Sequence, residues 1–293
     1  MVFNFKELRP PANYPPYPPY HTGPYLEEYF YDFYLKNKIL FDQTGHTLIP
    51  IFWTNLLHLR TFTKENIQHY IDVLPKDKKY FTVSQLDDGI EQELPQNTIN
   101  FVAGGNMTGI CLPLICSSIP PQYIKNTNKD IFCSFVGTYV TNDEKYKCRV
   151  TMYKTYHQDL DFYFSKPRHW QHLVNEQNFL EFINITQRSK FTLCPRGYGL
   201  SSFRLYETMQ LNSVPVYIFD KKFTPFENIL NWEEFCILIH ESEISQLKEK
   251  LLNVSENKYN EMLKKGQEVY KEYFTLEGMS QQILRILKDE CSN

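Results

Sequence analysis

The sequence lacks both patterns that would carry it into or across a membrane. No run of roughly 18 apolar residues occurs anywhere in the chain. The N-terminal stretch also lacks the basic region and apolar core of a secretory signal. These absences predict a cytoplasmic protein without a membrane span.

Metal and disulfide motifs are missing as well. The seven cysteines show no CxxC spacing and the eight histidines show no HExxH pattern, which excludes the common zinc motifs. An odd number of cysteines, several of them in apolar surroundings, predicts buried thiols in a reducing compartment. The net charge of −3 gives no basic excess that would favour nucleic acid as a partner.

Apolar and aromatic residues are plentiful instead. Hydrophobic residues make up 42% of the 293 positions, enough for a sizeable core and against wholesale disorder. Aromatic residues reach 16%, and such rings fill cores or stack on the apolar faces of sugars. Both interpretations of the aromatic content stay open at this stage.

Strand-like and helix-like segments alternate along the chain, which predicts an α/β fold with parallel sheets. A polar stretch with two prolines, Ile119–Asp130, is the best domain boundary. We expect two Rossmann-like halves that face a cleft, residues 1–120 and 121–274, with a C-terminal helix of residues 275–293 packing back on the first. The expected helices are Leu26–Lys36, Lys64–Val73, Ser255–Tyr273 and Ser280–Asp289. The expected strands are Thr47–Trp53, Lys79–Ser84, Ile99–Ala103, Pro113–Ser117, Ile131–Val136, Phe191–Cys194, Val214–Phe219 and Cys236–Ile239.

The most informative segment is a predicted strand, loop and helix within Phe191–Ile218, FTLCPRGYGLSSFRLYETMQLNSVPVYI. The strand ends at Pro195, because proline cannot donate to the ladder. Gly197 and Gly199 allow the backbone to turn and to approach a ligand closely. Ser201 or Ser202 is then a natural N-cap for the next helix. That helix is expected to end near residue 212, an asparagine suited to the left-handed conformation.

A glycine-containing loop that leads into a helix N-terminus is typical of an anion site. Arg196 in the loop and Arg204 in the first turn supply donors that match a diphosphate. Glu207, one turn after Arg204, is suited to accept hydrogen bonds from the hydroxyls of a ribose. The alternative is a structural turn followed by a surface ion pair of Arg204 with Glu207.

Several motifs together resemble the exostosin-like transferases, glycosyltransferase family 47. They are Cys-Pro-Arg-Gly, Ser-Phe-Arg and Glu207 in the segment above, then Val-Pro-Val, Pro225-Phe226 and Asn231-Trp232. This similarity extends over roughly 191–252. Upstream, Phe135-Val-Gly137 with Arg149 resembles the element that opens the family's C-terminal half, and Lys79–Gly89 resembles an N-terminal strand ending in a His-Asp-x-Gly type turn.

The resemblance implies a GT-B fold, a nucleotide-diphosphate sugar as donor, an oligosaccharide or glycan acceptor and inversion without an obligatory metal or other cofactor. The implied diphosphate contacts are Arg149 and Arg204, with Ser202 at the helix start, Glu207 on the ribose and Arg196 as a further contact. With the loop residues, the predicted donor site is Arg149, Arg196, Gly197, Ser201, Ser202, Arg204 and Glu207. UDP is the expected nucleotide, and xylose is the first expected sugar, ahead of galactose, glucuronic acid and N-acetylglucosamine.

The sequence departs from the family pattern in two places. Leu86 stands where the motif often has His, so no imidazole acts there, and Asn212 replaces a small residue after the helix. The chain is short for the fold and is similar to the compact soluble forms found in some bacteria and large DNA viruses.

Inverting transfer needs a base that deprotonates the acceptor hydroxyl. Asp87 is the first candidate and Asp88 the second, because both follow the predicted strand 79–84. An Asx turn closed by Gly89 explains the same residues without any chemistry. Glu27 and Glu28 are expected on the solvated face of their helix.

Three other functions stay open. A structural or scaffold role predicts no nucleotide binding at all. A non-catalytic nucleotide- or carbohydrate-binding protein would keep the anion site without a base. Asp159-Leu160-Asp161 matches the DxD motif of metal-dependent GT-A transferases, although three-residue matches are common by chance.

Overall fold

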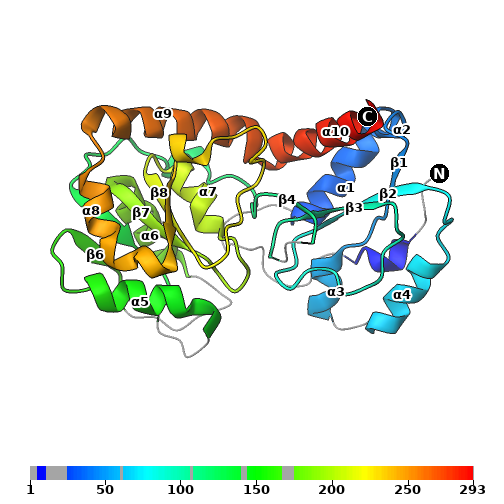
Figure 1. The fold of residues 1–293 in the computed structure, drawn as a ribbon, viewed down its shortest axis with the longest axis horizontal. Coiled ribbons are helices and arrows are strands. Elements are labelled where there is room, and N and C mark those ends of the chain that lie inside the picture. The colour runs from blue at the N-terminus through cyan, green and yellow to red at the C-terminus, as the bar shows by residue number, and fades with distance from the viewer. Residues whose placement is uncertain are drawn as a thin grey trace.

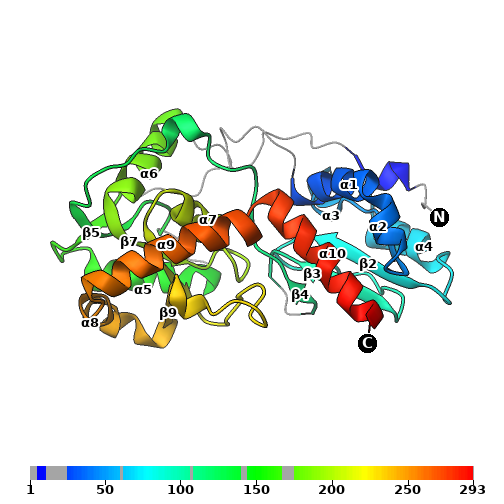
Figure 2. The same cartoon turned by 90° about the horizontal axis from the view of Figure 1, so that it is seen from above.

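The computed structural model describes residues 5–10, 25–59, 62–105, 108–139, 144–166 and 175–292. It forms two α/β halves that lie side by side and are bridged by the last two long helices (Figures 1 and 2). Both sheets are entirely parallel. The predicted α/β class with two parallel sheets is confirmed.

The N-terminal half contains a four-stranded sheet in the order β1-β2-β3-β4. Its central strand β2 is buried from Tyr80 onward, as expected for a parallel sheet that is covered on both faces. The described elements of this half are η1 (Lys6–Leu8), α1 (Leu26–Lys36), α2 (Lys38–Asp42), β1 (His46–Leu48), α3 (Trp53–Leu59), α4 (Lys64–Asp72), β2 (Lys79–Ser84), β3 (Thr98–Val102) and β4 (Ile110–Cys111).

The C-terminal half contains a five-stranded sheet in the order β6-β5-β7-β8-β9. Its elements are η2 (Pro121–Tyr123), β5 (Ile131–Phe135), η3 (Glu144–Tyr146), α5 (Lys147–Tyr156), β6 (Phe162–Phe164), α6 (Glu176–Arg188), β7 (Ser189–Pro195), α7 (Phe203–Gln210), β8 (Val214–Phe219), η4 (Trp232–Glu234), β9 (Ile237–His240), η5 (Glu241–Gln246), α8 (Leu247–Leu252), α9 (Glu256–Tyr273) and α10 (Leu276–Ser292).

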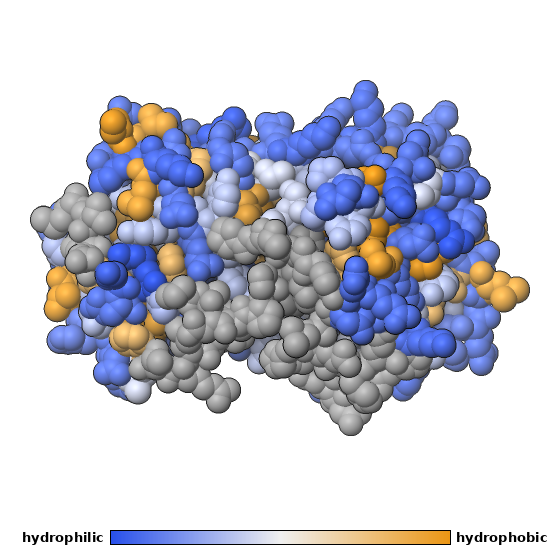
Figure 3. Space-filling model, turned by 180° about the vertical axis from the view of Figure 1, so that it is seen from behind, coloured by the Kyte–Doolittle hydropathy of each residue, from blue (hydrophilic) through white to orange (hydrophobic). Residues whose placement is uncertain are grey.

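Helices α9 and α10 cross from one half to the other (Figure 2). Helix α9 packs on α7 and β8, whereas α10 packs on α1 and α2 of the N-terminal half. One buried cluster accordingly contains side chains from both halves, such as Phe81, Tyr217 and Phe274, each with no more than 1% of its surface exposed. The described surface in Figure 3 is mostly hydrophilic, and its apolar residues form small separate groups.

Two predicted strands differ from the structure, and proline explains both. The expected strand Thr47–Trp53 is observed only as β1, which ends at Leu48. The Ile49 amide still donates to Phe81 O at 2.8 Å, but Pro50 has no amide to continue the ladder. The expected strand Pro113–Ser117 is absent. Pairing there belongs to β4 and stops at Leu112, whose amide donates to Val102 O at 2.7 Å, one residue before Pro113.

Candidate functional site

The C-terminal sheet has a switch point between β5 and β7. The chain leaves β5 toward β6 on one side, and β7 pairs with β5 on the other. Ligands of such sheets bind beyond the carboxyl ends of the strands at this point, because the crossovers diverge there. Gly137 follows β5 and Gly197 follows β7, so the topology brings two glycine loops to one edge of the sheet.

Arg204 reaches from helix α7 to the loop that follows β5. Its guanidinium lies 4.6 Å from the ring centre of Phe135 and 5.4 Å from that of Phe182. A Cβ atom at Gly137 would lie only 2.8 Å from Arg204 Nη2. Glycine at 137 therefore leaves the space that the Arg204 side chain occupies.

Arg149, on α5, contacts both the loop after β5 and the loop after β7. Its Nε donates to Arg196 O at 3.0 Å and its Nη1 donates to Thr138 O at 3.3 Å. A Cβ atom at Gly197 would lie 3.8 Å from Arg149 Nη2. The two predicted arginines thus lie beside the two loops at the switch point.

Helix α7 begins at the same edge. Ser202 occupies the N-cap position with extended backbone (φ −153°, ψ 135°), but its side chain makes no capping hydrogen bond. Both Ser201 and Ser202 are buried, with 1% and 8% of their surfaces exposed. The helix ends at Gln210, and Asn212 adopts the predicted left-handed conformation (φ 57°). The positive end of the α7 dipole is therefore directed toward the loop after β7.

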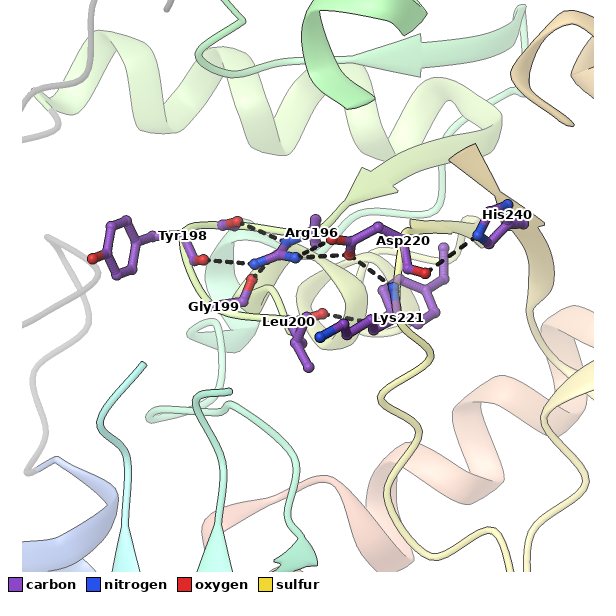
Figure 4. A network of polar contacts seen from close by, with 9 residues as sticks. Arg196, Tyr198, Gly199, Leu200, Asp220, Lys221 and His240 are labelled. Carbon is purple, nitrogen blue, oxygen red and sulfur yellow. Dashed lines mark hydrogen bonds and ion pairs between the residues drawn. The ribbon is translucent and has the colours of Figure 1, made fainter. Parts of the chain in front are cut away.

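Arg196 forms a network of its own, shown in Figure 4. Its Nη1 donates to both carboxylate oxygens of Asp220, at 2.7 and 2.6 Å. Its Nη2 donates to Tyr198 O at 2.8 Å and its Nε donates to Gly199 O at 3.2 Å. Only 9% of Arg196 is exposed, so these contacts favour a role in shaping the loop over a direct contact with phosphate.

Asp220 links this loop to the ends of β8 and β9. Burial opposes ionisation of its carboxyl, but the hydrogen bonds from Arg196 hold the pKa of Asp220 below its usual value. His240 Nε2 lies 3.2 Å from Asp220 O. The loop after β7 is therefore anchored to two neighbouring strand ends.

Glu207 lies on α7 near the segment that connects the two halves. Burial is the main cause of the raised pKa values of Cys116 and Tyr270, and the charge of Glu207 adds to both. This neighbourhood is the side of α7 that faces the connecting segment. A contact between Glu207 and a ribose stays a prediction.

Asp87 lies where the N-terminal half touches the loop after β7. A Cβ atom at Gly199 would lie 2.5 Å from Asp87 Oδ1 and 2.1 Å from Gly104 O. Asp87 is exposed by its surface area, yet desolvation by the nearby protein atoms, and then the charge of Asp88, raise its pKa to about 6. The structure thus brings the first candidate base to the loop that precedes α7.

Asp88 instead joins the two halves directly. Lys145 Nζ lies 3.2 Å from Asp88 Oδ1 and 3.3 Å from the ring centre of Tyr198, and Tyr198 Oη donates to Asp88 Oδ2 at 3.3 Å. Gly89 does close a turn here, with a positive φ of 79°, but the bond that closes it is a backbone one, from the Gly89 amide to Leu86 O at 3.2 Å, and not the side-chain bond of an Asx turn. Because Asp88 is engaged in these contacts, they favour Asp87 over Asp88 as the general base.

Lys248 neutralises both carboxylates of the DxD match. Its Nζ lies 2.7 Å from Asp159 Oδ2 and 2.8 Å from Asp161 Oδ2. Among the residues that the structure describes, no group of three or more His, Cys, Asp or Glu side chains is arranged to hold a metal ion. This geometry favours a surface ion-pair cluster over a diphosphate site.

The expectation that Glu27 lies on a solvated helix face is wrong. Only 3% of Glu27 is exposed, and its carboxylate accepts hydrogen bonds from Gln85 and Thr54. Glu28, expected on the same face, accepts a bond from the Tyr25 amide at 2.9 Å and so caps the start of α1. The sequence periodicity missed Glu27 because α3 and the end of β2 cover this side of the helix.

Substitution of Gly199 by Ala should disrupt the contact between the two halves. The added Cβ atom would collide with backbone oxygen and with Asp87, so we expect a loss of about 1–3 kcal/mol of stability. Thermal unfolding measures this loss. Gly197→Ala is the matched control, because its Cβ atom would approach Ser201 O only to 3.2 Å. Equal melting temperatures for the two variants would contradict the close approach.

The Exostosin GT47 domain model matches residues 96–254. Over 107 residues, the chain is 35% identical to a probable glycosyltransferase of Arabidopsis thaliana, covering 36% of this chain and 22% of the relative. It is 30% identical over 120 residues to an exostosin-1 homolog of Caenorhabditis elegans, covering 41% of this chain and 31% of the relative. Among solved structures, a GtfA/B complex has a TM-score of 0.46 at 12% identity, covering 87% of this chain and 60% of that one.

The chain spans less than a third of the length of these two relatives. No helix within the described ranges is both long and apolar enough to cross a membrane.

Proposed function

Because this chain belongs to the exostosin GT47 family, we propose that it is an inverting glycosyltransferase that moves a sugar from a nucleotide diphosphate to a hydroxyl of a glycan. The observation that carries this proposal is the pair of guanidiniums beside the two glycine loops at the β5/β7 switch point. The proposed donor site does not include Asp159 or Asp161.

Arg204 and Arg149 would bind the diphosphate together with the N-terminus of α7. Planar guanidiniums match phosphate oxygens with two parallel donors, and a helix N-terminus adds amide donors and a positive dipole end. The same groups would stabilise the charge that develops on the departing nucleotide diphosphate. Arg196 and Asp220 would keep the loop in the shape that this binding requires, because Arg196 donates to loop carbonyls at 197, 198 and 199.

Asp87 would accept the proton of the acceptor hydroxyl. A pKa of about 6 leaves its carboxylate mostly ionised at pH 7 and still basic enough to take a proton. Its position against Gly199 supports this role, since that loop leads into the helix proposed to bind the donor. Both reacting groups would then meet where the two halves touch.

UDP is the proposed nucleotide, and UDP-xylose is the first donor to test, ahead of UDP-galactose, UDP-glucuronic acid and UDP-N-acetylglucosamine. A thermal-shift panel of nucleotide sugars tests binding, because a ligand of the native state raises the melting temperature. Release of UDP in the presence of glycan acceptors then tests transfer. Failure of every nucleotide sugar to shift the melting temperature would contradict the proposal, whereas binding without any UDP release would favour a non-catalytic binding protein.

Removal of metal should leave the reaction unchanged. We expect full transfer in EDTA, and transfer within about twofold of wild type for Asp159→Asn, because Asp159 is paired with Lys248. The pair is partly exposed, and ion pairs near the surface contribute at most about 1 kcal/mol, so the variant should also fold. Transfer that is lost in EDTA and restored by a divalent cation would contradict this expectation and favour the GT-A alternative.

A further inference from the structure

Glu27 is a buried carboxylate that the proposed reaction does not use. It lies in the first turn of α1, with 3% of its surface exposed. Burial raises its pKa to about 7, against the effect of three hydrogen bonds to the carboxylate. Over the described parts of the chain, no lysine or arginine lies within ion-pair distance of Glu27.

Glu27 connects three segments that are far apart in the sequence. Its Oε1 accepts hydrogen bonds from the backbone N–H of Gln85 at 2.8 Å and from Thr54 Oγ1 at 2.9 Å. Its Oε2 accepts from the Thr54 amide at 3.0 Å. The Gln85 side chain returns a contact, accepting from the Leu26 amide at 3.3 Å. The carboxylate thus joins the start of α1, the start of α3 and the end of β2.

The end of β2 carries the proposed base. Gln85 precedes Asp87 by two residues, and the turn that holds Asp87 is closed by the bond from the Gly89 amide to Leu86 O. Fixing the Gln85 amide therefore fixes the entry to this turn. Burying a carboxylate costs free energy unless hydrogen bonds satisfy it, and the three bonds to Glu27 satisfy it at the junction that leads to this turn.

We propose, on the premise of the proposed function, that Glu27 is a positioning residue for the transfer reaction, whose carboxylate holds the β2 end so that Asp87 faces the loop before α7. Glu27 does not contact the reacting atoms in this scheme. Its three hydrogen bonds set the position and the solvation of Asp87, so both should change when the bonds are weakened.

Glu27→Gln is the main test, because it keeps the shape but places an amide nitrogen opposite groups that donate. We expect kcat to fall at least tenfold, while KM for the donor and the affinity for UDP stay within twofold of wild type. In wild type, protonation of Glu27 near pH 7 should also lower kcat, because the protonated acid can no longer accept all three hydrogen bonds, and Glu27→Gln should lose this step. The matched control is Glu28→Gln, one position along α1, which should keep the wild-type kcat.

A kcat of Glu27→Gln within twofold of wild type would overturn the proposal, as would equal losses in kcat and UDP affinity. If Glu27→Gln does not fold, Thr54→Val removes only the hydroxyl bond to Oε1. This variant should then lower kcat severalfold, and an unchanged kcat would be contrary to the proposal.

Hydrogen exchange separates this inference from the proposed function. If the wild-type chain transfers no sugar, the proposed function fails. The role of Glu27 in positioning the turn is then tested only by the hydrogen-exchange rates of the backbone amides of residues 86–89. Glu27→Gln should accelerate their exchange at least tenfold relative to Glu28→Gln. Equal exchange in the two variants would show that Glu27 does not position this turn.

Discussion

Substitution of Asp87 by Asn is expected to lower the turnover number by roughly 10²–10⁴-fold, the usual contribution of a general base. Asparagine keeps the size of the side chain but cannot accept the acceptor proton. The affinity for UDP should not change, because Asp87 belongs to the N-terminal half and the proposed phosphate ligands belong to the other. Steady-state transfer and calorimetry with UDP measure the two quantities separately.

The pH dependence of the same reaction follows from the raised pKa of Asp87. Its carboxylate is the active form, so kcat/KM should rise as the pH increases through about 6. The Asp87→Asn variant should lose this rise. Asp88→Asn is the control, since Asp88 pairs with Lys145 and should affect transfer only severalfold. Turnover that is unaltered in Asp87→Asn would place the base elsewhere.

Substitution of Arg204 by Ala is expected to weaken UDP binding at least about a hundredfold. Each hydrogen bond to a charged group contributes about 1.5–3 kcal/mol, and a guanidinium forms two such bonds with phosphate. Arg204→Lys keeps the charge but loses the planar pair of donors, so its affinity should lie between those of wild type and Arg204→Ala. Calorimetric titration with UDP measures all three.

Arg188 provides a matched control in the same half. It is an exposed arginine at the end of α6, paired with Asp130 away from the switch point, with its Nε 2.9 Å from Asp130 Oδ1. Arg188→Ala should bind UDP within twofold of wild type. If Arg204→Ala also binds UDP like wild type, Arg204 is not a ligand of the diphosphate.

The elements that local chemistry determines were predicted well from the sequence. Strand β8 has the predicted bounds, and Asn212 adopts the left-handed conformation that was expected from its place after a helix. An N-cap at Ser201 or Ser202 was predicted for the same reason, because a serine after a glycine loop is a local signal, and Ser202 takes the position. In each case the residues that decide the structure are neighbours in the chain.

Contacts between distant segments could not be predicted in this way. Gly197 and Gly199 were expected to approach a ligand, yet Gly199 is needed because its backbone packs against Asp87 from the other half. Arg196 was expected on the diphosphate, but Asp220 at the end of β8 supplies its carboxylate partner. Glu27 was placed on the surface, since α3 and β2 bury it only after the chain has folded.

The central claim is that the β5/β7 switch point binds two linked phosphates, and titration of the wild-type chain with UDP and with uridine tests it most directly. We predict one UDP site per chain, at least a hundredfold tighter than uridine, with an affinity that falls as salt screens the two arginines. Equal affinities for UDP and uridine, or no measurable binding of UDP, would contradict the claim.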